Sequence, residues 1–176
     1  RSAPIGWSHL GGDLDGLSGD YAGISVSLSS DGTIVAVGAY GNSNYKGTVR
    51  VYQRNANNTT VAPIGWSQLG GDLDGLSGHY AGSSVSLSSD GTIVAVGAYG
   101  NSNYNGTARV YQRNANNTTV APIGWSQIGG DLDGETGDHA GGSVSLSSDG
   151  TIVAVGAYGY GGLKGTVRSE KHTSEL

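Results

Sequence analysis

Residues 23–41 decide the fold, and they read Gly-Ile-Ser-Val-Ser-Leu-Ser-Ser-Asp-Gly-Thr-Ile-Val-Ala-Val-Gly-Ala-Tyr-Gly. Val26 and Leu28 alternate with serines, which is the period of a β-strand with one buried face. Ser30-Asp31-Gly32 then provides a tight turn, because glycine tolerates the positive φ that short hairpins require. The apolar run Thr33–Ala39 predicts a second strand that is covered on both faces. The segment therefore predicts a β-hairpin.

This hairpin belongs to a unit that occurs three times. The motif Ala-Pro-Ile-Gly-Trp begins at Ala3, Ala62 and Ala121, so the period is 59 residues. The first two units differ at only five positions, and the third is more divergent. A fixed period of this size is typical of repeat architectures. We divide the chain into three units and a tail, which are residues 3–61, 62–120, 121–168 and 169–176.

Each unit contains four predicted strands and no segment with helical spacing. In the first unit the outer two are Ile5–Leu10 and Thr48–Gln53, and the hairpin supplies the others. The turn region 41–47 and the polar linker Asn55–Thr60 are predicted to lie outside the strands. Four short antiparallel strands per repeat are typical of a β-propeller blade. We therefore expect an all-β fold of tandem four-stranded antiparallel blades, in an incomplete ring or an open array.

Composition limits the function classes. The 176 residues include 33 glycines and no cysteine, and the net charge is −5. An acidic chain without a basic run argues against nucleic acid as a partner. No apolar run approaches the length of a membrane-spanning helix, and without cysteine there are no disulfides or thiolate metal sites. We therefore expect a folded β-protein that binds no nucleic acid and has no membrane span.

The two ends differ from the repeats. After Arg168, the third unit departs from the Val-Tyr-Gln that follows Arg50, and reads Ser-Glu-Lys-His-Thr-Ser-Glu-Leu. Residues 168–176 resemble the translation of a sequencing-library adapter, so we expect a fragment truncated within its third repeat, with a non-native tail. A genuine polar tail is the alternative.

The repeated motif resembles a known repeat family. Gly-x-Ser-Val-Ser-Leu-Ser-x-Asp-Gly-Thr-Ile-Val-Ala-Val-Gly-Ala, followed by Gly-Thr-Val-Arg-Val-Tyr, resembles FG-GAP-type repeats, the blades of integrin-α-like propellers. The preceding Trp-Ser-x-Leu-Gly-Gly-Asp-Leu-Asp-Gly is similar to a variant in large secreted and surface proteins. No phenylalanine precedes Gly23, Gly82 or Gly141, so the name-giving Phe-Gly is missing. The resemblance implies an extracellular structural, adhesive or ligand-binding role.

The Gly/Asp-rich loops are candidate Ca²⁺ sites. Carboxylates two residues apart, with glycines nearby, can wrap a hard cation that prefers oxygen ligands. Integrin-like propellers carry Ca²⁺ in similar loops, although Leu17, Leu76 or Glu135 stands where a third alternating carboxylate would fall. Aspartate and glycine are also ordinary turn residues. The candidate ligands are Asp13, Asp15, Asp20, Asp72, Asp74, Asp131, Asp133 and Asp138.

Asn-x-Thr sequons form a second group of candidate sites. They lie in predicted linkers and turns, where a secreted chain could carry an N-glycan. Simple polar linker chemistry is the alternative. The acceptors are Asn57, Asn58, Asn105, Asn116 and Asn117.

Other residue types indicate no catalytic site. None of His9, His79 and His139 recurs at the same position of another unit, which favours surface histidines. The serines have no Gly-x-Ser-x-Gly motif or repeated His/Asp partner. Tyrosines such as Tyr40 and Tyr45 could pack at unit boundaries or line a sugar-stacking surface.

The sequence is compatible with three functions. We expect a non-enzymatic extracellular structural or adhesive protein, a building block of a surface filament that associates with itself or with further repeats. The alternative is a propeller that binds glycans or surface proteins with the help of Ca²⁺. An enzyme on the same scaffold is the third reading, and no acid, base and nucleophile support it.

Overall fold

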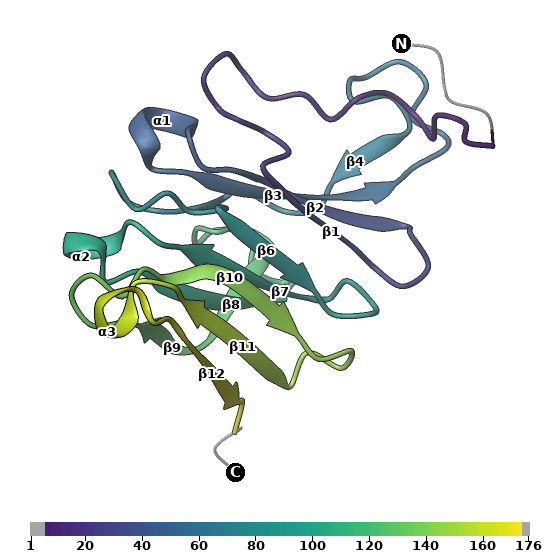
Figure 1. Cartoon of the computed structure of the whole chain (residues 1–176). Coiled ribbons are helices and arrows are strands. Elements are labelled where there is room, and N and C mark those ends of the chain that lie inside the picture. The colour runs from purple at the N-terminus through teal and green to yellow at the C-terminus, as the bar shows by residue number, and fades with distance from the viewer. Residues whose placement is uncertain (1–5, 174–176) are drawn as a thin grey trace.

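The computed structural model describes residues 6–173, which form three antiparallel sheets (Figure 1). The first sheet contains β1 (Ser25–Leu28), β2 (Ile34–Ala39), β3 (Thr48–Arg54), β4 (Trp66–Gln68) and β5 (Leu73–Asp74). The second sheet contains β6 (Ser84–Leu87), β7 (Ile93–Ala98), β8 (Thr107–Arg113) and β9 (Trp125–Asp133). The third sheet contains β10 (Ala140–Leu146), β11 (Ile152–Ala157) and β12 (Thr166–Lys171). The prediction of an all-β fold of short antiparallel strands is confirmed.

The predicted hairpin is present in every unit. β1 pairs with β2 from Ser25 opposite Gly38 to Leu28 opposite Val35. At the turn, the Ser29 N–H donates a hydrogen bond of 2.9 Å to the carbonyl of Ile34. Gly32 has a φ of +71°, a conformation that explains the glycine at this turn position.

The sheets are offset from the sequence repeats. β4 comes from the second repeat, yet it pairs with β3 of the first, with Trp66 opposite Arg54. β9 pairs with β8 in the same way, with Trp125 opposite Arg113. The strand predicted at Ile5–Leu10 is therefore present in the second and third repeats. In the first repeat residues 6–10 form no strand, and Ile5 lies outside the described residues. The third sheet accordingly has three strands.

The turn region 41–47 differs from the prediction, because it contains a short helical turn. The three such elements, each of four residues, are α1 (Asn42–Tyr45), α2 (Asn101–Tyr104) and α3 (Tyr160–Leu163). Ser43 and Asn44 have φ angles of 49° and 60°, so the centre of α1 is left-handed. The third repeat has Gly161 and Gly162 at these positions, where glycine carries no steric cost. Within residues 6–173 no helix is long and apolar enough to span a membrane.

Stacking of the sheets builds the core. The strands follow one another in layers from the N-terminal to the C-terminal end of the chain, with α1, α2 and α3 along one side (Figure 1). The core between the first two sheets includes Val49 and Val94, both completely buried, and the indole of Trp125. The buried apolar side chains between the second and third sheets are all alanine or valine, and they include Ala108 and Val155.

Trp125 provides a test of this packing. Its side chain is completely buried, so Trp125→Ala should lower the free energy of unfolding by about 3–5 kcal/mol. Trp7 occupies the same position of the first repeat but is 79% exposed. Trp7→Ala should therefore change the stability of the dilute monomer by less than about 0.5 kcal/mol. Urea unfolding followed by circular dichroism measures both, and equal losses would contradict this packing.

Candidate functional site

The surfaces through which sheets meet are the most regular feature of the structure. The first strand of each sheet (β1, β6 or β10) carries serines on the side of the following sheet and Val/Leu side chains on the side of the preceding sheet. Val85 and Leu87 of β6 are 8% and 7% exposed because they pack on the first sheet. From the first sheet, the Ser25 hydroxyl donates a hydrogen bond of 2.7 Å to the carbonyl of Gly82. A serine face and a Val/Leu face therefore form one junction.

The second junction repeats the first. Ser84 Oγ donates to the carbonyl of Gly141 at 2.8 Å. Ser86 Oγ accepts a hydrogen bond of 2.9 Å from the Leu146 N–H, as Ser27 Oγ accepts one from Leu87. These half-buried hydroxyls satisfy backbone groups of the neighbouring sheet, and buried backbone groups are costly to leave unpaired. The serines that alternate along the strand are therefore interface residues.

A glycine on the central strand allows the sheets to approach closely. A methyl group added at Gly97 would overlap the carbonyl oxygen of Gly141 in the third sheet. Among the described residues no sheet follows the equivalent Gly156, and a methyl group there would overlap only the Ser143 hydroxyl of its own sheet. Gly97 and Gly156 therefore differ because only Gly97 faces the backbone of a neighbouring sheet.

Gly97→Ala and Gly156→Ala form a matched pair. The first substitution should lower the free energy of unfolding by about 1–3 kcal/mol, because the third-sheet backbone must move away. The second should cost less, because the Ser143 side chain can rotate. Chemical denaturation of both variants measures the difference, and equal costs would show that sheet spacing is not set by this glycine.

Both ends of the stack leave a junction surface uncovered. Val26 and Leu28 of β1 are 63% and 60% exposed, whereas their equivalents Val85 and Leu87 are buried. At the other end Val167 is 70% exposed, whereas its equivalent Val49 is completely buried. The expectation of one buried face for residues 25–28 is thus met in β6 but not in β1, because β1 has no preceding sheet among the described residues.

Tryptophans on β4 and β9 pack towards the N-terminal side of their sheets, and Trp125 completes the first junction in this way. The Trp125 indole N–H donates a hydrogen bond of 2.8 Å to the carbonyl of Leu69, and Arg113 lies over the ring, with its guanidinium carbon 5.6 Å from the ring centre. Trp66 repeats this arrangement with Leu10 and Arg54, at 3.1 Å and 5.7 Å. Each indole is therefore fixed by an aliphatic wall, a carbonyl and a cation.

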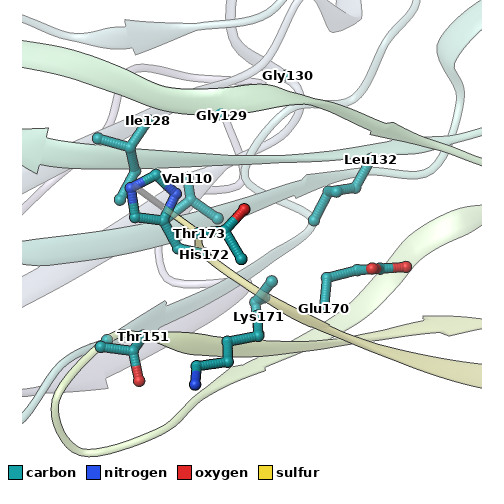
Figure 2. Close-up of a pocket in the computed structure, with 12 residues that line it drawn as sticks. Val110, Ile128, Gly129, Gly130, Leu132, Thr151, Glu170, Lys171, His172 and Thr173 are labelled. Atoms are coloured by element: carbon teal, nitrogen blue, oxygen red, sulfur yellow. The ribbon is translucent and has the colours of Figure 1, made fainter. Parts of the chain in front are cut away.

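A cavity lies between β9 and β12, with a volume of about 450 Å³. Its apolar wall contains Val110, Ile128, Leu132 and Val153. In Figure 2, Ile128 and Leu132 lie on one side of the cavity and Lys171 and Glu170 on the other. No sequence pattern pointed to this cavity, because it depends on the offset between sheets and repeats.

The structure places most of the candidate Ca²⁺ ligands beside cations or backbone donors of the chain. Asp72 pairs with Arg50 at 2.9 Å, and Asp74 pairs with Lys46 at 2.9 Å. Asp131 pairs with Arg109 at 2.7 Å, and this guanidinium lowers the pKa of the Asp131 carboxyl. Across residues 6–173 no three acidic or histidine side chains are grouped as metal ligands.

The remaining candidate ligands have other positions. Asp20 is buried and accepts a hydrogen bond of 3.0 Å from the Leu17 N–H, and Asp138 accepts one of 2.9 Å from Glu135. These two carboxylates close their own loops. Asp13, Asp15 and Asp133 are exposed. Binding of Ca²⁺ stays a prediction, and these contacts give it no preformed ligand set.

Hydrogen bonds separate the sequons into two kinds. The Asn58 side-chain nitrogen, to which a glycan would be attached, donates to the carbonyls of Val61, Pro63 and Trp66. Asn117 makes the three equivalent bonds. Asn105 is half-buried. The exposed acceptors are Asn57 and Asn116, so the glycosylation prediction rests on these two.

Aromatic rings form a ladder that crosses both junctions. Tyr21 stacks on Tyr40 with ring centres 5.1 Å apart, and Tyr80 stacks on Tyr99 at 5.0 Å. Tyr40 and Tyr80 lie 6.0 Å apart across the first junction. His139 continues the ladder on Tyr158 at 4.6 Å. The tyrosines therefore pack at unit boundaries, as one of the two sequence readings expects, and His139 is half-buried among them.

The hairpin turn holds a perturbed carboxylate. Asp149 Oδ1 accepts a hydrogen bond of 2.6 Å from the Ser147 hydroxyl and one of 3.0 Å from the Thr151 N–H. These donors favour the charged form and lower the pKa of Asp149 to about 2. The same contacts lower the pKa of Asp31 and Asp90.

These turns predict a loss of stability in acid. Because the folded pKa of Asp149 is lower than its ordinary value of 3.8, its contribution is complete above about pH 5 and is lost progressively as the pH falls towards 2. Carboxyl NMR titration should show a midpoint near 2, and Ser147→Ala should raise it. A wild-type midpoint near 3.8 would contradict the role of these hydrogen bonds.

Comparison with known proteins adds one structural similarity. No protein-family model matches the chain, and no curated protein does. Among solved structures, hydrazine synthase from Kuenenia stuttgartiensis is similar, with 13% sequence identity and a TM-score of 0.49. The similarity covers 84% of this chain and 45% of that chain, so this chain spans less than half the length of that relative. The relation to FG-GAP-type repeats stays a prediction.

Proposed function

We propose that the protein is a non-enzymatic extracellular structural or adhesive repeat protein. In this proposal the three sheets are blades of a propeller-type array, and further blades stack on its two end faces. One observation carries the proposal: residues that are buried at the internal junctions are exposed at the ends. Val26 is 63% exposed where Val85 is 8% exposed, and Val167 is 70% exposed where Val49 is completely buried.

The two end faces are unlike one another and complementary. One presents the Val/Leu side of β1, and the other presents Ser143 and Ser145 of β10, which are exposed. Inside the chain these same two kinds of surface form both junctions. Contacts of this head-to-tail kind give rings if the rotation closes and filaments if it does not. A filament or appendage built from such units is the role that we propose.

The extracellular location rests on two further points. The repeats resemble those of secreted surface proteins, and exposed sequons occur at Asn57 and Asn116. A role in binding glycans or surface proteins is the second candidate. It is favoured by exposed rings along the ladder: Tyr21 and Tyr158 are 55% and 52% exposed, and Tyr104, whose ring centre lies 5.1 Å from that of His139, is 53% exposed.

Electron microscopy and sedimentation velocity test the structural role. The purified chain should associate with increasing concentration into rings or filaments built from stacked sheets. Leu28→Asp places a charge on the exposed end face, and should abolish association without unfolding the chain, because Leu28 is 60% exposed. Leu163→Asp is the control, because Leu163 is 79% exposed and lies in α3 at the side of the stack. A chain that stays monomeric at all concentrations would overturn the proposal.

A further inference from the structure

The cavity between β9 and β12 corresponds to the Trp125 site of the first junction. Moving each wall residue back by one period of 59 residues converts Val110, Ile128 and Val153 into Val51, Leu69 and Val94. Those residues surround Trp125 at the first internal junction. Gly129 and Gly130 of the cavity likewise correspond to Gly70 and Gly71, and a methyl group at Gly70 would overlap the Trp125 ring. The cavity therefore has the walls of an indole site.

The chain carries one tryptophan without such a site. Trp7 stands in Gly6-Trp7-Ser8, the same sequence as Gly65–Ser67 and Gly124–Ser126. Its two equivalents are 7% and 0% exposed, whereas Trp7 is 79% exposed. Residues 6–10 form no strand, although the equivalent segments form β4 and the start of β9. The segment and the cavity lie at opposite ends of the stack (Figure 1), so one chain cannot join them.

We propose that residues 6–10 of one copy add a fourth strand to β12 of a second copy, with Trp7 in the cavity. The proposal rests on the proposed self-association and names its mechanism, which is strand addition to an open sheet edge. The internal pairs Arg54–Trp66 and Tyr52–Gln68 fix the register. Trp7 should therefore lie opposite His172, and His9 opposite Glu170. The Trp7 indole N–H should donate to the carbonyl of Ile128.

The hydrogen bonds of the donor segment are compatible with this docking. The carbonyl of Leu10 already accepts from Trp66 within its own chain. At the internal junction the equivalent Leu69 accepts from Trp125 and also donates its N–H to the carbonyl of Val51 at 2.7 Å. The Leu10 carbonyl therefore binds Trp66 of its own chain, while the Leu10 N–H is the group that would pair with the sheet of the second copy. Leu10 can bind both copies at once.

The acceptor edge differs from the internal edges in a way that can be tested. Where β3 continues with Val51-Tyr52-Gln53-Arg54, β12 and the residue after it read Ser169-Glu170-Lys171-His172. Arg54 lies over the Trp66 ring, and His172 lacks the guanidinium for this contact. Restoring the internal sequence with S169V/E170Y/K171Q/H172R should strengthen association at least tenfold.

Disulfide trapping tests the register directly, because the chain has no cysteine of its own. His9→Cys and Glu170→Cys chains, mixed under oxidised glutathione, should give a cross-linked pair of chains. Facing residues that exchange no backbone hydrogen bonds have Cα atoms about 4.5 Å apart, close enough for a disulfide. Ser8→Cys, one residue out of register, is the control and should cross-link much less to Glu170→Cys. Equal yields would overturn the register.

Trp7→Ala separates this mechanism from the proposed function. It should weaken association at least tenfold in sedimentation velocity, whereas Leu17→Ala should not, because Leu17 is also 79% exposed and its equivalent Leu76 stays 61% exposed beside a junction. If Trp7→Ala associates like the wild type and no disulfide forms, strand addition is wrong but self-association stands. If neither the wild type nor the S169V/E170Y/K171Q/H172R variant associates, strand addition and the proposed self-association are both wrong. A disulfide formed within single chains of the H9C/E170C double variant would exclude a second copy as the donor.

Discussion

The structure depends on one pairing, in which the tryptophan-bearing strands of the second and third repeats complete the sheets of the repeats before them. Trp66 lies opposite Arg54, and Trp125 lies opposite Arg113. The strand is bonded to one sheet, while the carbonyl that follows it accepts the indole N–H of the next tryptophan. Backbone pairing along a sheet and indole packing between sheets are therefore coupled. Neither repeat nor sheet is an independent unit, as in solenoid proteins whose stability comes from neighbours.

Close approach between the sheets explains much of the unusual composition. Gly38 and Gly97 face backbone carbonyls of the next sheet, where a methyl group would not fit. Serines fill the same face because a hydroxyl is small and can satisfy a backbone group of the neighbouring sheet. A composition rich in glycine and serine often indicates disorder, but here both residue types stand at fixed positions of a packed junction.

The local sequence predicted the hairpins and the all-β class, because the alternation of Val26 and Leu28 with serines and the glycine at position 32 are local signals. It did not predict which sheet each strand joins, because that choice depends on contacts across the repeat boundary. The left-handed turn at Ser43 and Asn44 was also missed, since both residues are common in ordinary turns. The predicted acidic loops are partly strands, since Asp131 lies in β9 and Asp74 lies in β5. Asp72 and Asp131 each pair with an arginine of the neighbouring strand, a contact that the spacing of the carboxylates does not predict.

Repetition also explains why the ends of the stack differ from ordinary protein surfaces. In repeat proteins the outer faces of terminal units are usually polar, which blocks further stacking. Here Val26 and Leu28 remain at the first face, and Ile128 and Val153 remain in the open cavity. The last strand of the third repeat is polar at Ser169, Glu170 and Lys171, where β12 departs from the internal sequence. In the proposed strand addition, this polar edge would weaken pairing with the segment 6–10 without removing the contact of Trp7 with the apolar cavity. The strength of assembly should therefore depend chiefly on this one edge.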